Sequence, residues 1–368
     1  MKILHFSDSK VWGGSEEQLF YLLKNDCSCE HILVCLDETP SSIRKKDLSC
    51  RVICLKKRKK YHFQILRDYI DVLKNEEPDI IHIHTRVGLT LHYVLSKFFH
   101  LKAPIVFSKK NLGVNSAYIK RKKYNSDIIK RYICISNAVK DDLVSILTED
   151  NRKNVTVIYD GIPTDKIGNS NLPSLKKHYS LPSDAFIVGN IANHTRAKDL
   201  LTLVEVVNIL VNINGYKNIF VIQVGEDNKL TEQMKNKIEE YDISSNLILH
   251  GFQKNAIQLV PQFDLYTLTS EREGLSVSIL EALAQGKAVV ATNAGGIPEA
   301  VKDNYVGLLS PVKDAQSLAN NITRLYEDRD LLRTFESNAI PYVEENFSLS
   351  KYVKDTCRVY HELYGEFY

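Results

Sequence analysis

The sequence predicts an α/β protein made of two doubly wound, parallel-sheet domains in tandem. Short apolar runs rich in Val and Ile alternate with longer stretches that carry apolar residues at helical spacing. The apolar runs show no polar alternation, which is typical of parallel strands that helices cover on both faces. This rhythm lapses once, at 164–184, and then restarts, so the 368 residues divide into two domains of similar size.

The first domain is predicted to span 1–163 and to begin with a strand. The opening segment MKILHFSDSK turns polar after a few residues, which favours a first strand over a signal peptide. The segments between the strands predict helices, most clearly at 15–25 and 64–75. The predicted strands of this domain are 2–6, 31–36, 79–84, 104–108, 132–136 and 155–159.

The second domain is predicted to span 164–348. It opens with a polar, proline-containing segment, 164–184, which predicts a linker. A last helical stretch, 349–364, follows without a strand of its own. The predicted strands of this domain are 186–192, 219–225, 247–252, 264–270, 288–292 and 306–310.

Composition and cysteine usage narrow the class of protein. No stretch approaches the roughly 20 consecutive apolar residues that span a bilayer, and 25% of the residues are charged. The seven cysteines form no CxxC pair, so neither a zinc site nor a disulfide framework is expected. Reduced thiols and a cytoplasmic location are the simplest interpretation.

Positive charge is concentrated in one part of the sequence. Residues 41–131 hold 22 Lys and Arg against 7 Asp and Glu, with runs at 56–60 and 120–123. A solvated surface would explain either run alone. Their concentration in one region predicts a face that attracts anionic membrane lipid. Nucleic acid is not expected as a partner, because no recognisable nucleic-acid-binding module accompanies the charge.

Open parallel sheets bind ligands beyond the carboxyl ends of their strands, so polar residues there are candidate site residues. Gly13 and Gly14 follow the first strand and precede a helix that is expected to begin near Ser15, which lets backbone N–H groups approach an anion. An ordinary turn would use the same two glycines. The pattern is not GxGxxG, which argues against an NAD-dependent dehydrogenase.

Two further strands end in candidate residues. In PDIIHIHT, His82 and His84 point to one face of the strand, and His84 lies at its carboxyl end. A core histidine is the favoured interpretation of His82, whereas His84 fits a core residue or a partner of a sugar hydroxyl equally well. Arg196 and Lys198 follow NIANHT, and paired cations there suit a diphosphate, although a solvated pair is the ordinary alternative.

Two glutamates lie eight positions apart after the strand DLYTLTS. Glu273 belongs to the loop, Ser276 is the expected N-cap, and a helix carries Glu281 before Gly286 ends it. The residues beside Glu281 are apolar, so this helix is expected to be mostly buried. Because an unpaired carboxylate is expensive there, ligand hydroxyls are the predicted partners.

The segment DRD at 328–330 has the Asp-x-Asp spacing of metal-dependent sugar transferases. It lies in a highly charged stretch between helices, and no strand precedes it. A ligand site on a parallel sheet would be expected after a strand. We therefore predict a solvated surface there, with no metal.

The segment 270–299, SEREGLSVSILEALAQGKAVVATNAGGIPE, closely resembles the EX7E motif of retaining glycosyltransferases in the group typified by sucrose synthases and bacterial mannosyltransferases. The resemblance extends over nearly the whole chain through PDIIHIH, ICISNAV, VIYDGI and HGF. It implies a GT-B fold, in which two Rossmann-like domains face a central cleft. It also implies that the last helix, 349–368, packs back on the first domain.

The resemblance implies a role for each candidate residue. The implied catalytic residues are Glu273 on the hydroxyls of the transferred sugar, Lys198 and Arg196 on the leaving diphosphate, and His84 beside the sugar. The implied donor-binding residues are Glu281 on the ribose hydroxyls, Phe252 near the base, the backbone of Gly274, Leu275 and Ser276, and Gly13, Gly14 and Asn193. The chain departs from the family where Asn193 replaces a common arginine and where YDG at 159–161 replaces PNG.

The resemblance also implies the reaction. The expected enzyme is a retaining, metal-independent glycosyltransferase that needs no cofactor and uses a nucleotide-diphosphate sugar, with uridine as the expected base. The expected acceptor is a saccharide or lipid-linked saccharide in lipopolysaccharide, capsule or similar surface-glycan biosynthesis, on the cytoplasmic face of the membrane. The alternatives are a non-catalytic nucleotide-sugar-binding subunit and a UDP-N-acetylglucosamine 2-epimerase-like enzyme, a class that lacks the Glu-x7-Glu arrangement.

Overall fold

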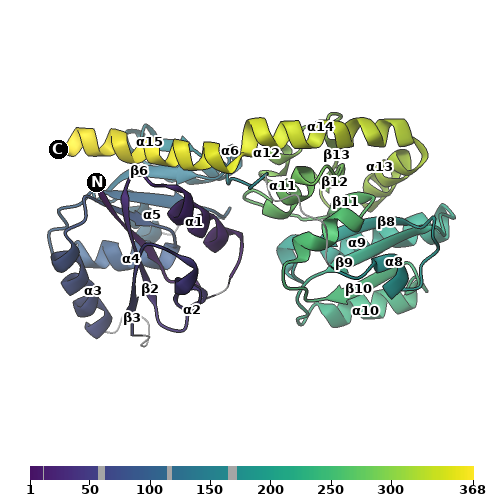
Figure 1. Ribbon diagram of the computed structural model, residues 1–368, viewed down its shortest axis with the longest axis horizontal. Coiled ribbons are helices and arrows are strands. Elements are labelled where there is room, and N and C mark those ends of the chain that lie inside the picture. The colour runs from purple at the N-terminus through teal and green to yellow at the C-terminus, as the bar shows by residue number, and fades with distance from the viewer. Residues whose placement is uncertain (11, 57–62, 114–117, 165–171) are drawn as a thin grey trace. The chain divides into compact units, whose positions relative to one another are not determined.

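The computed structural model describes residues 1–10, 12–56, 63–113, 118–164 and 172–368. The chain divides into two compact units, each of alternating strands and helices (Figure 1). The first unit comprises Met1–Gly161 together with Leu349–Tyr368, and the second comprises Ile162–Ser348. The sequence had placed the boundary between 163 and 164.

The first unit is a Rossmann-like domain. Its described strands form a seven-stranded parallel sheet in the order β3-β2-β1-β4-β5-β6-β7. Six strands were predicted, but β3 was missed because it is a half-buried edge strand that lies between charged segments. The strands are β1 (Lys2–Ser7), β2 (Glu30–Leu36), β3 (Arg51–Leu55), β4 (Ile80–Ile83), β5 (Ile105–Lys109), β6 (Ile129–Cys134) and β7 (Val155–Val157).

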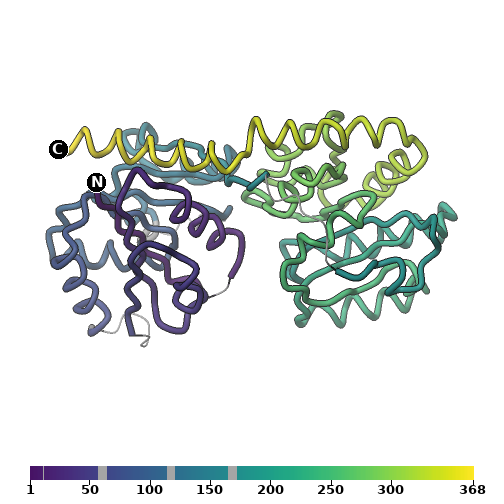
Figure 2. The backbone as a smooth tube through the Cα atoms, viewed as in Figure 1, coloured from purple at the N-terminus to yellow at the C-terminus, as the bar shows by residue number. Residues whose placement is uncertain are grey.

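The last helix of the chain belongs to the first unit, where it lies beside the first helix (Figure 2). Ile3, Leu22 and Ile80 form a buried cluster with Tyr360 and Leu363 of this last helix, so both helices cover the same face of the sheet. The helices of this unit are α1 (Gly14–Asn25), α2 (Pro40–Ile43), α3 (Phe63–Glu76), α4 (Arg86–Leu95), α5 (Tyr118–Tyr124), α6 (Asn137–Val144), α7 (Glu149–Arg152) and α15 (Leu349–Phe367).

The second unit is a second Rossmann-like domain with a parallel sheet in the order β10-β9-β8-β11-β12-β13. All six of its described strands lie where the sequence predicted them. The strands are β8 (Phe186–Ile191), β9 (Ile219–Val224), β10 (Leu247–Gly251), β11 (Leu265–Leu268), β12 (Val289–Thr292) and β13 (Gly307–Ser310). The helices are α8 (Leu175–His178), α9 (Leu200–Asn208), α10 (Thr231–Glu240), α11 (Val277–Ala284), α12 (Ile297–Ala300), α13 (Ala315–Glu327) and α14 (Arg329–Phe347).

The predicted linker is partly structured. Residues 165–171 of this segment lie outside the described part of the chain. Further on, Leu175–His178 forms α8, with the Ser174 hydroxyl accepting a hydrogen bond from the Lys177 N–H and Leu175 buried. The interpretation of all of 164–184 as a linker is therefore wrong for α8, where a single apolar residue anchors a helix too short to show a periodic pattern.

The strand order places the candidate residues at one kind of position in both units. The order reverses between β1 and β4 in the first sheet and between β8 and β11 in the second. Crevices at the carboxyl ends of such strand pairs are the usual ligand sites of doubly wound sheets. Gly13 follows β1, His84 follows β4, Lys198 follows β8, and Glu273 follows β11.

Candidate functional site

The centre of the candidate site in the second unit is an ion pair. The Lys198 ammonium donates to Oε1 of Glu273, and the Ser270 hydroxyl donates to the same oxygen at 3.1 Å. The side chains of Lys198 and Glu273 are 24% and 12% exposed, so solvent and a ligand can still reach both. Structure thus brings together two of the predicted catalytic residues, which are 75 positions apart in the sequence.

Hydrogen bonds to backbone carbonyls hold together the two loops that carry this pair. The loop after β8 makes a short 3-10 turn, Arg196–Lys198, and ends at Asp199 in the left-handed region with φ 45°. The Thr269 hydroxyl lies 3.1 Å from the Lys198 carbonyl and 3.0 Å from the Asp199 carbonyl, to which it can donate. The Glu271 N–H donates to the Ala197 carbonyl at 2.9 Å, so the loop after β11 is tied to the loop after β8.

Helix α11 presents Glu281 from an apolar background. Ile279, Leu280 and Leu283 are fully buried, while Glu281 is half-buried, as the sequence predicted for a mostly buried helix. Ser276 occupies the predicted N-cap position, but its hydroxyl pairs with that of Ser278 at 3.2 Å and makes no capping hydrogen bond. The expected side-chain cap is therefore absent at Ser276.

The two glutamates act on one buried ring. Burial raises the pKa of Tyr266 well above its usual range, and the carboxylates of Glu281 and Glu273 raise it further. The hydroxyl of Tyr266 lies 3.3 Å from both the N–H and the carbonyl of Ile191, at the end of β8. Both carboxylates therefore lie in the electrostatic range of the same hydroxyl.

Three other predicted residues of the second unit are exposed. Arg196 is exposed, and in the described part of the chain it forms no ion pair with Glu273; its charge acts instead on Glu271, which pairs with Lys313 at 2.9 Å. Asn193 is exposed and accepts a hydrogen bond from the Glu226 N–H at 3.1 Å. Phe252 is 70% exposed and follows Gly251, whose φ is +82°.

The backbone of the predicted donor-binding loop is partly covered by the protein. Leu275 and Ser276 are buried, and the Glu273 carbonyl accepts a hydrogen bond from the Gly296 N–H at 3.0 Å. Gly274 links these residues to Glu273. A ligand at this loop would meet its rim rather than its whole backbone.

The first unit has a recess of about 160 Å³ at the carboxyl edge of its sheet. The ends of β1, β4 and β5 and the start of α1 contribute its walls, so it lies at the reversal of strand order. The residues that line it are Ser9, Ser15, Glu16, His84, Thr85, Arg86, Phe107, Ser108, Lys109, Lys110 and Asn111. His84 is the one predicted catalytic residue in this set.

Two lysines of the recess were not predicted as site residues. Lys110 forms a buried ion pair with Asp160 at 2.5 Å. Lys109 is 2% exposed, lies 3.6 Å from Asp142, and its ammonium makes no hydrogen bond in the described chain. Burial lowers the pKa of Lys109. Their position immediately after the strand 104–108 was the signal that could have found them.

Helix α1 begins at Gly14, one residue before the predicted start, and Gly13 is its N-cap. Gly13 has an extended backbone with φ −160°, and nothing lies within 4 Å of the position of an added Cβ. Neither backbone strain nor crowding in the described chain requires a glycine at 13.

His82 is the satisfied core histidine that the sequence favoured. It is 1% exposed, with Nδ1 2.5 Å from the Tyr360 hydroxyl and Nε2 2.7 Å from the Ser108 hydroxyl. His84 is half-buried, and its Nε2 lies 3.0 Å from Nδ1 of His5. One nitrogen from each of His5, His82 and His84 lies within 4.8 Å of the others, but both nitrogens of His82 are already hydrogen-bonded.

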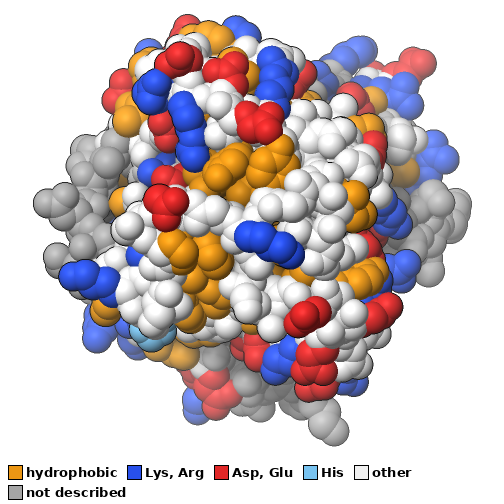
Figure 3. All heavy atoms as spheres, turned by 90° about the vertical axis from the view of Figure 1, so that its right-hand side faces the viewer, with side chains coloured by type: hydrophobic (Ala, Val, Ile, Leu, Met, Phe, Trp, Pro, Cys, Tyr) orange, Lys and Arg blue, Asp and Glu red, His pale blue; other side chains and the backbone are white. Residues whose placement is uncertain are grey.

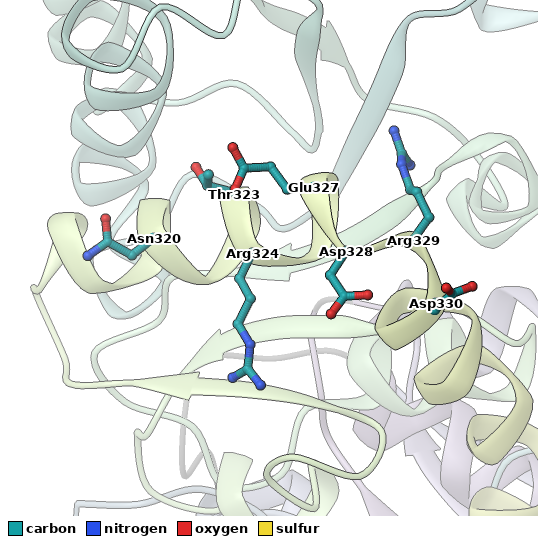
Figure 4. A pocket seen from close by; sticks show the side chains of 7 residues that line it. All are labelled: Asn320, Thr323, Arg324, Glu327, Asp328, Arg329 and Asp330. Atoms are coloured by element: carbon teal, nitrogen blue, oxygen red, sulfur yellow. The ribbon is translucent and has the colours of Figure 1, made fainter.

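The DRD segment lines a separate recess of about 730 Å³, formed by residues of α13 and α14 (Figure 4). Asp328 accepts a hydrogen bond from the Leu331 N–H as the N-cap of α14, and Asp330 pairs with Arg333 at 2.5 Å. Arg324 and Asp328 point to one side of the helix and Glu327 to the other. These side chains serve local contacts and do not converge on a ligand.

Three basic residues of the predicted basic region pair with acids from elsewhere in the chain. Lys109, Lys110 and Arg131 pair with Asp142, Asp160 and Glu366, all outside 41–131. The run 56–60 lies mostly outside the described residues. On the face of the second unit that Figure 3 shows, charges of both signs are mixed with apolar side chains. At these three positions the positive charge of 41–131 is offset by acids that lie outside this range.

All seven cysteines are free, and no helix in the described ranges is both long and apolar enough to cross a membrane. The family model of the glycosyl transferases group 1 matches residues 173–341, and that of Glycosyltransferase Family 4 matches residues 12–166. The chain therefore consists of two glycosyltransferase domains.

Relatives agree with this family, and solved structures share the fold of the chain. The glycosyltransferase is 24% identical to the UDP-Gal:alpha-D-GlcNAc-diphosphoundecaprenol alpha-1,3-galactosyltransferase of Escherichia coli, over 96% of this chain and 95% of that one. It is also 24% identical to the N-acetyl-alpha-D-glucosaminyl L-malate synthase of Bacillus anthracis, over 82% and 80%. Anabaena Alr3699/HepE in complex with UDP-glucose shares its fold with a TM-score of 0.86 at 20% identity, over 98% and 100%. The two Rossmann-like domains form a GT-B fold.

Proposed function

We propose that this glycosyltransferase moves a sugar from a UDP-sugar to a saccharide or lipid-linked saccharide acceptor of a surface glycan, with retention at the anomeric carbon. The proposal is supported by the names of the relatives, which include a UDP-galactose-dependent enzyme with a lipid-diphosphate-linked acceptor. Retention is supported by the likeness of 270–299 to the EX7E motif.

The observation that carries the proposal is the Lys198–Glu273 pair with Glu281 near it. Glu273 accepts two hydrogen bonds on Oε1, and Oε2 is left to accept from a sugar hydroxyl. Glu281 offers a carboxylate to the ribose diol. The Lys198 ammonium has three donors and keeps two of them beyond its bond to Glu273. Lys198 and Arg196 would neutralise the diphosphate as it leaves.

The reaction then depends on electrostatic support of the leaving group. No carboxylate of the candidate site is placed as a nucleophile in this proposal. The departing diphosphate takes the proton of the attacking acceptor hydroxyl, so the new bond forms on the face from which the old one breaks. No metal takes part in this proposal, because the cations of Lys198 and Arg196 supply the positive charge.

Donor binding is tested with Glu281→Gln and two nucleotides. Loss of one charge-assisted hydrogen bond costs about 2 kcal/mol, so we expect UDP to bind the variant about 30-fold more weakly. With 2′-deoxy-UDP, which lacks one of the two hydroxyls, the loss should be at least about threefold smaller. Isothermal titration calorimetry measures all four affinities. Equal losses for both nucleotides would contradict the assignment of Glu281 to the ribose.

The activity itself is tested by a thermal-shift panel of nucleotide sugars, followed by mass spectrometry of products on candidate acceptors. We expect stabilisation by a UDP-sugar, slow release of its sugar in water, and transfer to a saccharide acceptor. Binding without hydrolysis or transfer would favour the non-catalytic subunit. Release of an epimerised free sugar would favour the epimerase.

We also propose peripheral contact with anionic lipid on the cytoplasmic membrane face. Described side chains that support it are the exposed Phe98 and Phe99, which follow Lys97 at the end of α4. Co-sedimentation with vesicles of neutral lipid, with and without anionic lipid, measures it. We expect binding that needs the anionic lipid. It should weaken as salt rises from about 0.1 to about 0.5 M, because salt shortens the Debye length and screens the attraction. Binding that is independent of both would contradict it.

A further inference from the structure

Three histidines of the first unit lie on one face of its sheet. In the parallel register Ile3 is opposite His31, and His5 is opposite His82. Side chains two positions apart in a strand share a face, so His31 of β2, His5 of β1 and His84 beyond β4 all point to the side that α1 and α15 cover. His5 is fully buried, and His31 is 6% exposed.

These rings form a continuous hydrogen-bonded chain. His31 Nδ1 lies 2.9 Å from His5 Nε2, and His5 Nδ1 lies 3.0 Å from His84 Nε2. The chain ends on Asp26 at the end of α1, whose Oδ2 lies 2.9 Å from His31 Nε2. At its other end, His84 lines the first-unit recess. A buried carboxylate is thereby connected to the recess through three rings.

The carboxylate determines which nitrogen of each ring carries the proton. Burial opposes ionisation of Asp26, but hydrogen bonds from His31 and Ser28 hold its pKa below the usual range, so it accepts only. A neutral ring has one N–H and one lone pair. His31 therefore donates from Nε2 to Asp26, His5 donates from Nε2 to His31, and His84 donates from Nε2 to His5.

We propose that Asp26, His31 and His5 are positioning residues that hold His84 with an unprotonated Nδ1, ready to accept a hydrogen bond from a hydroxyl of a saccharide in the first-unit recess. This inference rests on the proposed function and adds to it the protonation state of His84. Among the described residues His84 Nδ1 has no hydrogen-bond partner of its own. A ligand hydroxyl would supply it.

The surroundings favour neutral rings. Burial lowers the pKa values of His5 and His84 well below the usual range. The neighbouring histidines lower both pKa values further, as does Lys110 for His84, while Asp26 acts in the opposite direction on His5. Thr85 fixes the backbone beside His84, because its hydroxyl caps α4 by accepting from the Gly88 N–H at 2.9 Å. We call the hydrogen-bonded chain of Asp26, His31, His5 and His84 the relay. The titratable groups that face the relay from the packed elements are Glu16 of α1, His82 of β4, Lys110 after β5, and Cys357 and Tyr360 of α15.

The structure suggests a variant that should invert the relay. Oδ1 of Asp26 accepts from the N–H of Ser28 at 2.8 Å and from its hydroxyl at 2.6 Å. In Asp26→Asn the amide oxygen would keep these two bonds, which places the amide N–H₂ against His31 Nε2. That ring would then have to accept at Nε2 and donate from Nδ1. The reversal would continue through His5 and leave His84 with its proton on Nδ1.

The experiment is ¹⁵N NMR of histidine-labelled protein, with signals identified by single His→Gln variants. In the wild type we expect His84 to be neutral with its proton on Nε2, and in Asp26→Asn to carry it on Nδ1. With the UDP-sugar found in the thermal-shift panel, kcat of Asp26→Asn should fall at least tenfold. Its affinity for UDP should not change. Tyr360→Phe is the matched control, because it removes the buried hydroxyl that contacts His82 and keeps the ring that faces His5.

The outcomes separate this inference from the proposed function. A wild-type His84 with its proton on Nδ1 would overturn the relay, and this measurement needs only His84→Gln to fold, so that the His84 signal can be identified. Unchanged His84 signals in Asp26→Asn, normal kcat despite an inverted His84, or an equal loss of kcat in Tyr360→Phe would overturn it as well. Failure to bind any nucleotide sugar would overturn the proposed function, while the wild-type spectrum would still decide how His84 is protonated.

Discussion

Two charged residues of the candidate site, Lys198 and Glu273, hold each other in place within one unit. Lys198 and Glu273 neutralise each other, and a second carboxylate, Glu281, stands half-buried on an apolar helix. Partly buried charges are tolerated only when they are paired or hydrogen-bonded, so the pair is fixed before any ligand arrives. A site held this way loses little entropy when it binds a polar ligand.

At this scale we predict that Lys198→Ala lowers kcat at least tenfold, which corresponds to about 1.4 kcal/mol of lost transition-state stabilisation. The Lys198 side chain is 24% exposed, and Glu273 keeps its hydrogen bond from Ser270, so the variant should stay folded. Steady-state release of UDP from the preferred UDP-sugar, together with the thermal midpoint, measures both effects. Lys313→Ala is the matched control, because Lys313 pairs with Glu271 on the surface and should keep kcat within about twofold. A normal rate in Lys198→Ala would contradict the role.

How far the site could be predicted from the sequence depends on what each residue relies on. Lys198 and Glu273 were found because each follows a strand with a clear apolar pattern. The relay residues Asp26, His31 and His5 were not found, because their contacts arise from the register of β1 with β2 and from the end of α1. Register is set by three-dimensional packing, and spacing along one sequence does not reveal it.

Helices and strands also differ in how well the sequence predicted them. Buried strands were predicted well, since continuous Val and Ile runs mark them, whereas the edge strand β3 and the four-residue helix α8 were missed. A central strand can also carry a constraint that its pattern hides. Gly189 lies in β8, and a Cβ there would be 2.0 Å from Cδ2 of Phe263, whose ring is buried. This strand leads into the turn that carries Lys198.

We therefore predict that Gly189→Ala destabilises the second unit by about 1–3 kcal/mol, the usual cost of overpacking a core. The added Cβ would force the Phe263 ring to move, and this movement is costly because the ring is buried. Thermal unfolding with and without UDP measures the effect. The matched control is Gly13→Ala, where φ is −160° and an added Cβ meets nothing within 4 Å, so stability should change by less than about 1 kcal/mol. An unchanged midpoint in Gly189→Ala would contradict the close approach.

At the scale of the whole molecule, the last helix, α15, completes the core of the first unit. Tyr352, Val359 and Tyr360 of α15 complete the buried cluster that begins with Ile3, so the first unit needs both ends of the chain. The single tryptophan, Trp12, also lies in this unit, 4.9 Å from the Phe20 ring and under the Arg44 guanidinium. Its fluorescence therefore reports on the first unit alone.

The first unit also contains histidines that are buried without charge. Burial lowers the pKa of His82 to about 3, with Lys110 adding to the effect, and lowers the pKa of His92 to about 4. In the unfolded chain a histidine titrates near 6.5. Between these values the unfolded state binds more protons than the folded state, so the free energy of unfolding falls as pH falls.

We predict that the first unit loses stability between pH 6.5 and pH 5. Each of His82 and His92 contributes about 1.4 kcal/mol per pH unit in this window, or about 2 kcal/mol at pH 5. Urea unfolding followed by Trp12 fluorescence should show a falling midpoint below pH 6.5. The same measurement between pH 7 and 8 is the control, since both histidines are then neutral in both states and the midpoint should stay constant. A midpoint that rises or does not change on acidification to pH 5 would show that these histidines are not held neutral in the folded protein.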